Sequence, residues 1–235
     1  MHKTKISLSW SGGKDCAYAL YLLRESGQFE VVGLHTTIGE ETRRVSMHGI
    51  HESLLDAQAL SLGLPLEKLY LPASGDNLAY ENVILKYLEK LEAQEVRHVA
   101  YGDILLEDLK KYREEKLAEK GFLGVFPLWN KDTFALSREF IHRGFRTKIC
   151  AEDVDKIDEH WIGRDFTLEF LQRLKPGIDP CGENGEFHTF CYDGPVFQFP
   201  VNIRCVKVIP KDYEYQTEGG IRERKTFLFA DLILT

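Results

Sequence analysis

Residues 6–16 read Ile-Ser-Leu-Ser-Trp-Ser-Gly-Gly-Lys-Asp-Cys, and a helical pattern follows from Ala17 to Ser26. The run Ile6–Trp10 alternates apolar and polar residues as a short strand does, and Gly27 ends the helical pattern. Two adjacent glycines let backbone amides curl around an anion, and the helix start adds the positive end of its dipole. The order strand, glycine loop, helix therefore predicts a phosphate site at the edge of an α/β sheet.

The side chains of this loop suit a bound triphosphate. Ser11 and Lys14 add hydrogen-bond donors, and Asp15 can hold a magnesium ion. The spacing fits neither the P-loop nor the dinucleotide fingerprint. It resembles S-G-G-x-D-[ST], the PP-loop of ATP pyrophosphatases, except that Cys16 stands last, where a thiol is a weak donor. The alternative is a plain strand-to-helix turn capped by Asp15.

In PP-loop enzymes the loop grips the β and γ phosphates and leaves the α phosphate open to an attacking oxygen. The resemblance therefore implies adenylation with pyrophosphate as the leaving group, ATP and Mg²⁺ as cofactors, and Asp15 and Lys14 as catalytic residues, with Asp15 as the metal ligand. The residues assigned to ATP are Ser9, Ser11, Gly12, Gly13, Lys14, Asp15, Cys16, Leu34, His35, Thr36, Gly102 and Asp103.

The first half of the chain alternates strand-like runs with helical patterns, which is typical of a parallel sheet wrapped by helices. The expected strands are Ile6–Trp10, Val31–Thr36, Leu66–Leu71, Val96–Tyr101 and Gly124–Leu128. The expected helices are Ala17–Ser26, Ile50–Ser61, Asn77–Gln94 and Leu105–Lys120. We therefore predict an α/β fold in which residues 1–131 form a doubly wound five-stranded parallel sheet, like the HUP and adenine nucleotide alpha hydrolase folds.

Residues 132–235 are expected to form a smaller α+β domain that binds the acceptor substrate. Their regular alternation is weaker, and loops rich in Gly, Pro, Asp and His separate the elements. The expected elements are helices Thr133–His142 and Asp165–Leu174, with strands Phe145–Cys150, Phe187–Tyr192, Val196–Val208 and Lys225–Leu234.

Residues 181–195 read Cys-Gly-Glu-Asn-Gly-Glu-Phe-His-Thr-Phe-Cys-Tyr-Asp-Gly-Pro. This stretch resembles the G-E-G-G-E-[FY]-E-T-F…D-x-P signature of the diphthine–ammonia ligase family, whose members amidate a modified histidine on elongation factor 2 with ATP and ammonium. Further matches are Gly102-Asp103-Ile104, Pro127-Leu128-Trp129 and 157–164. The departures are Asn184, His188, Lys111 and Lys131, which leave room for a different acceptor.

The resemblance implies that the acceptor substrate binds to the second motif, residues 181–195. Carboxylates there can pair with ammonium or with a cationic acceptor, whereas the plain alternative is a charged hairpin turn that binds nothing. The assigned substrate residues are Gly182, Glu183, Asn184, Gly185, Glu186 and Thr189. The implied partners are ATP, ammonium and a carboxylate acceptor such as a modified histidine on a protein. His2 stands where an N-terminal-nucleophile glutaminase needs cysteine, so free ammonium or a partner subunit would supply the nitrogen.

Charge, composition and cysteine content bear on the partners, the cellular location and the class of enzyme that we expect. A net charge of −7 gives no support to a nucleic-acid partner, and the short apolar run at the start neither spans a membrane nor forms a secretory signal. Five cysteines without a C-x-x-C pair indicate reduced thiols and a cytoplasmic protein. These features disfavour a PP-loop tRNA-modifying enzyme, while a non-catalytic nucleotide sensor and a homo-oligomer both stay open. His48 and His51 have the spacing of a metal pair, but no third ligand accompanies them.

Overall fold

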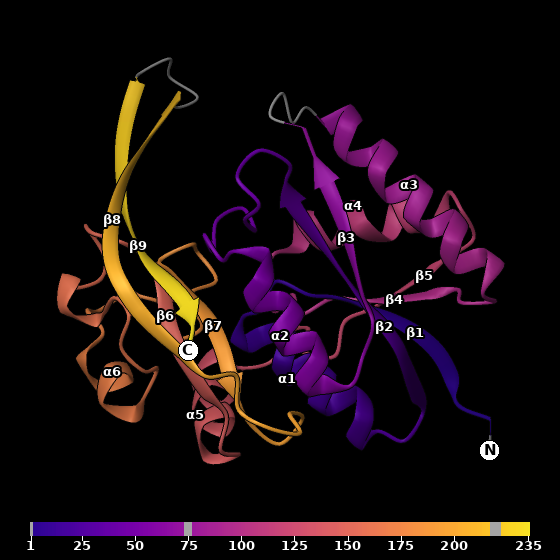
Figure 1. Cartoon of the computed structure of the whole chain (residues 1–235), viewed down its shortest axis with the longest axis horizontal. Coiled ribbons are helices and arrows are strands. Elements are labelled where there is room, and N and C mark those ends of the chain that lie inside the picture. The colour runs from indigo at the N-terminus through magenta and orange to yellow at the C-terminus, as the bar shows by residue number, and fades with distance from the viewer. Residues whose placement is uncertain (1, 73–76, 217–221) are drawn as a thin grey trace.

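The computed structural model describes residues 2–72, 77–216 and 222–235, which form two sheets (Figure 1). The first sheet has five parallel strands in the order β3-β2-β1-β4-β5. Its strands are β1 (Thr4–Ser9), β2 (Phe29–Gly39), β3 (Leu66–Leu71), β4 (His98–Ala100) and β5 (Leu123–Val125). The predicted doubly wound parallel sheet is therefore confirmed.

Four helices cover the two faces of this sheet. They are α1 (Lys14–Glu25), α2 (Glu52–Leu62), α3 (Asn77–Ala93) and α4 (Glu107–Ala118). The hydrophobic core around this sheet consists of two separate clusters. Leu20 of α1 and Leu55 of α2 belong to one, and Leu88 of α3 and Leu117 of α4 belong to the other. No helix in the described ranges is long and apolar enough to cross a membrane.

One predicted helix face is wrong. The apolar spacing put Leu60 on the buried side of the second helix, yet its side chain is 71% exposed. The helix begins at Glu52 rather than Ile50, and its buried side instead includes the polar residues Gln58 and Ser61. Periodicity was misleading here because these polar side chains are paired with backbone carbonyls from the distant second half of the chain, Gln58 with that of Cys191 and Ser61 with that of Phe199.

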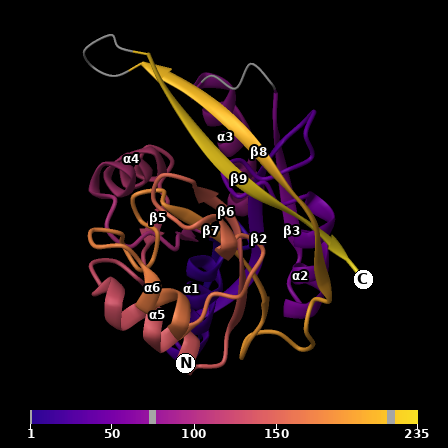
Figure 2. The ribbon, with the colours of Figure 1, turned by 90° about the vertical axis from the view of Figure 1, so that its left-hand side faces the viewer.

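The second sheet is antiparallel and has the order β7-β6-β9-β8. Its strands are β6 (Arg146–Asp153), β7 (Phe187–Asp193), β8 (Ile203–Gln216) and β9 (Arg222–Leu234). The accompanying helices are α5 (Thr133–His142), the short η1 (Glu159–Trp161) and α6 (Leu168–Arg173). The β8–β9 ribbon runs beyond the other two strands and projects from the body (Figures 1 and 2). Residues 196–202, predicted as part of a strand, lie outside it, between Pro195 and the start of β8.

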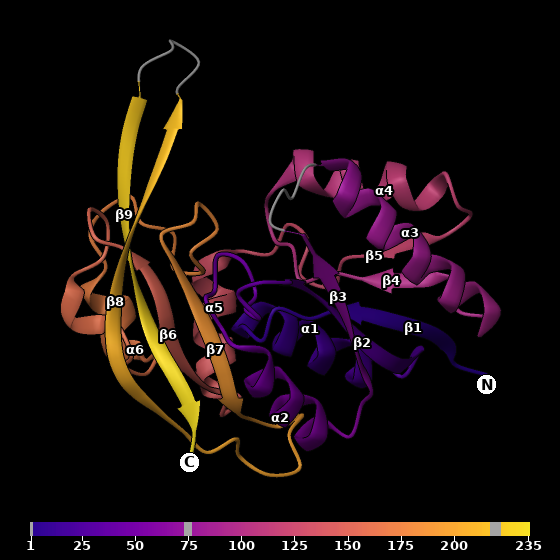
Figure 3. The ribbon, with the colours of Figure 1, turned by 45° about the horizontal axis from the view of Figure 1, so that its top comes forward.

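The second sheet lies on the side of the first that α1 and α2 cover, and its strand β7 contacts α1 (Figure 3). Phe190 of β7 and Phe140 of α5 share one buried cluster with Leu20 of α1. An apolar core that is continuous across both halves fixes their relative position, because separating them would expose these side chains to water. As a result β7 lies beside the start of α1, where the glycine loop is.

Glu152 of β6 is fully buried, and within the described ranges neither of its carboxyl oxygens has a hydrogen-bond partner. Burial, helped by the negative charges of Glu159 and Asp158, raises its pKa from 4.5 to about 8. Between these two pH values the folded protein holds a proton that the unfolded chain releases. The free energy of unfolding must therefore fall as the pH rises through this window.

Replacing Glu152 with glutamine should remove this penalty, because the amide stays neutral at every pH. We expect Glu152→Gln to raise the free energy of unfolding by on the order of 3 kcal/mol near pH 9, with little change near pH 5. Denaturant unfolding of both proteins at the two pH values measures the difference. An equal effect at both would mean that the carboxyl does not titrate in this window.

Candidate active site

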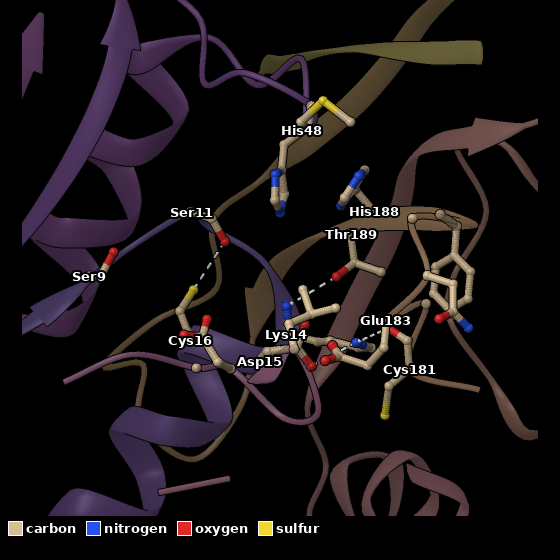
Figure 4. A pocket seen from close by; sticks show the side chains of 18 of the residues that line it. Ser9, Ser11, Lys14, Asp15, Cys16, His48, Cys181, Glu183, His188 and Thr189 are labelled. Atoms are coloured by element: carbon tan, nitrogen blue, oxygen red, sulfur yellow. Dashed lines mark hydrogen bonds and ion pairs between the residues drawn. The ribbon is translucent and has the colours of Figure 1, made fainter. Parts of the chain in front are cut away.

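A cavity of about 400 Å³ opens at the carboxyl ends of β1 and β4, between the two halves of the chain (Figure 4). Its walls come from the end of β1 with the glycine loop, the loop before α2, the residues after β4, Arg113 of α4, and β7 with the turn that precedes it. Ligands of open α/β sheets bind at this edge, where strands end and helices begin. The geometry therefore brings the two sequence motifs to one cavity.

The glycine loop needs its glycines for both conformation and space. Gly12 has φ +84°, and a Cβ there would lie 2.8 Å from Cδ2 of Leu55. A Cβ on Gly13 would meet the carbonyl oxygen of Thr189 at 3.1 Å and Nε2 of His48 at 3.2 Å. A side chain would be strained at Gly12 and tightly packed at Gly13, and the glycines there let the backbone of the loop approach a ligand closely.

Contacts from α2 and β7 hold the loop in place. Nε2 of Gln58 donates to the carbonyl of Gly12 at 3.0 Å, and the amide of Cys191 donates to the same oxygen at 2.8 Å. The hydroxyl of Thr189 accepts from the amide of Lys14 at 3.0 Å, so it supplies the first turn of α1 with an acceptor. Sequence reasoning missed Gln58, and its only signal was a polar residue in an apolar helical pattern.

Lys14 lies beneath the loop and is only 3% exposed. Its Nζ donates to Oδ1 of Asp15 at 2.6 Å and to the carbonyl of Cys181. Burial is the largest single influence and would by itself lower the pKa of Lys14, but the charge of Asp15, the hydrogen bond to it and the nearby acidic groups together outweigh burial and raise the pKa. The ammonium is therefore permanently charged, and it joins the glycine loop to the turn before β7.

Ser9 of β1 and the loop residues Ser11 and Cys16 line the cavity at the end of β1. Cys16 donates its thiol to the carbonyl of Gly13 at 3.1 Å and lies 3.7 Å from the hydroxyl of Ser11. Burial raises the pKa of Cys16 to about 11, so it stays a neutral thiol. With Cys16 in place of the usual serine or threonine, the side chain at this position still makes hydrogen bonds within the loop.

The segment after β4 forms the opposite wall. A Cβ on Gly102 would lie 2.9 Å from the carbonyl carbon of Asp15 and 3.0 Å from the amide nitrogen of Cys16, so the two backbones touch. Asp103 accepts two bonds from Nη1 of Arg113, whose guanidinium stacks on Tyr101 at 4.1 Å. Burial raises the pKa of Asp103, while Arg113 opposes that rise.

The turn before β7 places Gly182, Glu183, Asn184 and Gly185 along the cavity, with Thr189 on the strand itself. Oε2 of Glu183 accepts from the amide of Leu105 at 3.2 Å. Burial and the charge of Asp15 raise the pKa of Glu183 to about 7. Its carboxyl can therefore exchange a proton near neutral pH, and it can also pair with a cation.

Glu186, assigned with these residues to the substrate, does not line the cavity. It is 1% exposed and accepts from the amides of Asp179 and Asn184 and from Nδ2 of Asn184. A buried carboxylate with several donors organises the loop around it, because leaving those donors unpaired would be costly. Glu186 thus shapes the turn on which Glu183 and Asn184 stand.

Leu34, His35 and Thr36, which were assigned to ATP, lie on β2. All three side chains are buried and none lines the cavity, because β2 lies inside the sheet between β1 and β3. Nδ1 of His35 is 2.9 Å from the hydroxyl of Ser7, and burial lowers the pKa of His35 to about 3.

His48 and His51 do not form the metal pair that their spacing suggested. His51 caps α2 by accepting from the amide of Ser53, whereas His48 lines the cavity opposite His188 (Figure 4). Within the described residues no group of three or more His, Cys, Asp or Glu side chains is arranged to hold a metal ion.

Comparison with known families bears on both halves of the chain. A family model described as the diphthamide synthase N-terminal domain matches residues 4–123, and one described as the C-terminal domain matches residues 132–225. The chain belongs to the diphthamide synthase family. The matched ranges include both the glycine loop and the turn 182–185, and membership confirms the resemblance seen in the two motifs.

Similar proteins include diphthine–ammonia ligases of animals. The zebrafish (Danio rerio) protein is 27% identical over 92% of both chains, and the human protein is 27% identical over 85% of this chain and 82% of its own. The mouse protein is 28% identical over 80% of this chain and 78% of its own. Among solved structures, a U34-tRNA thiolase of Methanococcus maripaludis with its 4Fe-4S cluster aligns over 60% of this chain and 58% of its own, with a TM-score of 0.38 and 18% identity.

Proposed function

We propose that this protein is an ATP-dependent amide ligase of the diphthine–ammonia ligase type. In this proposal it adenylates a carboxylate, releases pyrophosphate and then transfers the acyl group to ammonia. The observation that carries the proposal is that the glycine loop and the turn 182–185 wall the same cavity. Family membership and the similarity to animal diphthine–ammonia ligases support it.

ATP would bind with its β and γ phosphates on residues 11–16. The glycines leave room for close backbone contact, and the start of α1 favours negative charge at that point. The Asp15 carboxylate lines the cavity and offers a hard oxygen ligand of the kind that suits Mg²⁺, so we assign the metal to Asp15, with the phosphates of ATP supplying further oxygens. A bound magnesium ion would offset the charge of the departing pyrophosphate.

The acceptor would enter from the side of the second motif. Glu183 and Asn184 project from a turn with two positive-φ glycines, Gly182 and Gly185, beside the loop that holds the phosphates. In the first step an acceptor carboxylate oxygen attacks the α phosphorus, and the bond from that phosphorus to the bridging oxygen breaks. In the second step ammonia attacks the acyl carbon and AMP leaves. Glu183, whose carboxyl titrates near neutral pH, can pair with incoming ammonium.

The reaction products test this proposal. The protein is incubated with Mg-ATP, ammonium and elongation factor 2 bearing diphthine labelled with heavy oxygen in its carboxylate. We expect AMP and pyrophosphate in equal amounts, one amide per AMP, and one heavy oxygen in each AMP. ADP and inorganic phosphate, or AMP without the label, would contradict acyl adenylation. Bound ATP with no turnover for any carboxylate offered would instead indicate a nucleotide sensor.

A further inference from the structure

Two histidines face each other at the cavity. His48 comes from the loop between β2 and α2, and His188 comes from β7 (Figure 4). Their ring centroids are 4.6 Å apart and the ring planes are tilted by 36°. The ring of His48 lies against the glycine loop, as the 3.2 Å between its Nε2 and a Cβ built on Gly13 shows. Both imidazoles therefore stand within reach of whatever the loop holds.

Two cations that line the cavity, Lys14 and Arg113, are each already paired with a carboxylate. Three carboxylates, those of Asp15, Asp103 and Glu183, line it together with the cations of Lys14 and Arg113. Lys14 is paired with Asp15, and Arg113 with Asp103. Among the described residues that line the cavity, the two histidines are the groups that can still add positive charge. Nε2 of His188 is buried and has no hydrogen-bond partner in the described part of the chain.

The pair is neutral when no anion is present. Burial lowers the pKa of His188 to about 4 and that of His48 well below its ordinary value, and the facing imidazole adds to the effect on His48. The charged group that faces both rings from another element is Lys14 of α1, which also lowers both values. A triphosphate brings the opposite charge, which favours the imidazolium form.

We propose that His48 and His188 form a clamp that takes up a proton and binds the outermost phosphate of ATP. When the triphosphate enters, one imidazole accepts a proton from solvent, and the two rings donate N–H bonds to the phosphate oxygens. When pyrophosphate leaves, the proton returns to solvent. The contact of His48 with Gly13 selects a terminal phosphate, because the loop holds that end of the nucleotide. This inference rests on the proposed function, since it assumes that ATP occupies the loop.

Calorimetry measures the proton directly. The full-length protein is titrated with Mg²⁺ and the α,β-methylene analogue of ATP near pH 7.5, in two buffers that differ in ionisation enthalpy. The difference in apparent binding enthalpy gives the number of protons taken up, and we expect roughly one per nucleotide. AMP, which lacks the terminal phosphates, should bind without this uptake.

Variants test whether the proton taken up on nucleotide binding is bound by His48 and His188. We expect His48→Gln and His188→Gln each to weaken binding of the analogue about tenfold near pH 6.5, and the double variant to take up no proton. His51→Gln, which changes a histidine outside the cavity, should bind as the wild type does. The thermal midpoint of each variant shows whether it is folded, and the buffer comparison on the wild type needs no variant.

The outcomes separate this inference from the proposed function. Tight binding by the wild type with no proton uptake would overturn the clamp and leave the ligase proposal standing. Proton uptake that persists in a folded double variant would overturn it as well, because other groups would then titrate. A wild-type protein that binds neither the analogue nor ATP would overturn both.

Discussion

Replacing Asp15 with asparagine should lower ATP turnover by about a thousandfold while the protein stays folded. Asp15 stands in the first turn of α1 and lines the cavity, and one of its oxygens accepts from Lys14. Asparagine keeps an oxygen for that contact but removes the charge that would hold magnesium. Release of pyrophosphate from ATP in the presence of ammonium and an acceptor measures the effect.

Asp56→Asn is the matched control. Asp56 on α2 is also paired with a lysine, Lys68, at the same 2.6 Å, but it lies away from the cavity. Losing a surface ion pair of this kind should change neither turnover nor stability by much. Turnover of Asp15→Asn within a factor of about three of the wild type would remove Asp15 from the mechanism.

Replacing Gly102 with alanine should reduce both nucleotide binding and turnover, by about a hundredfold in catalytic efficiency. The added methyl would press on the backbone of Asp15 and Cys16 at 2.9–3.0 Å, where no side chain can rotate away. The helix start and the loop would have to shift, and a displacement of this size misplaces every group that the loop presents. Binding of the ATP analogue and steady-state turnover measure the two effects.

A glycine elsewhere in the same sheet provides the control. A Cβ on Gly33 of β2 would meet Pro65 at 3.4 Å, an ordinary contact, so Gly33→Ala should bind and turn over ATP normally. If Gly102→Ala bound the analogue as tightly as Gly33→Ala, the close packing of the segment after β4 against the start of α1 would be irrelevant to the site.

Much of the fold was predictable because local patterns and fold rules agree in the first half. The third strand and the helix Thr133–His142 begin and end at the predicted residues. Strand–helix alternation implies a parallel sheet, and the glycine loop marks the edge where ligands bind. The predicted start of β8 was several residues too early, because apolar residues also occur in the irregular stretch between Pro195 and Pro200.

The candidate site was predicted in its parts but not in its assembly. Both motifs were recognisable, yet the bond that joins them connects Lys14 to Thr189, 175 residues later, and no local pattern encodes that register. For the same reason Gln58 was missed and Glu186 was expected in the cavity, where the structure instead has it holding a turn. His48 and His188 become a pair only when β7 lies beside the glycine loop.

The structure of the complex with Mg²⁺ and the α,β-methylene analogue of ATP tests the central claim most directly. We predict the two terminal phosphates against the backbone of residues 12–16 and the α phosphorus turned toward Glu183. A complex in which this loop stays empty while the triphosphate binds elsewhere would contradict the account.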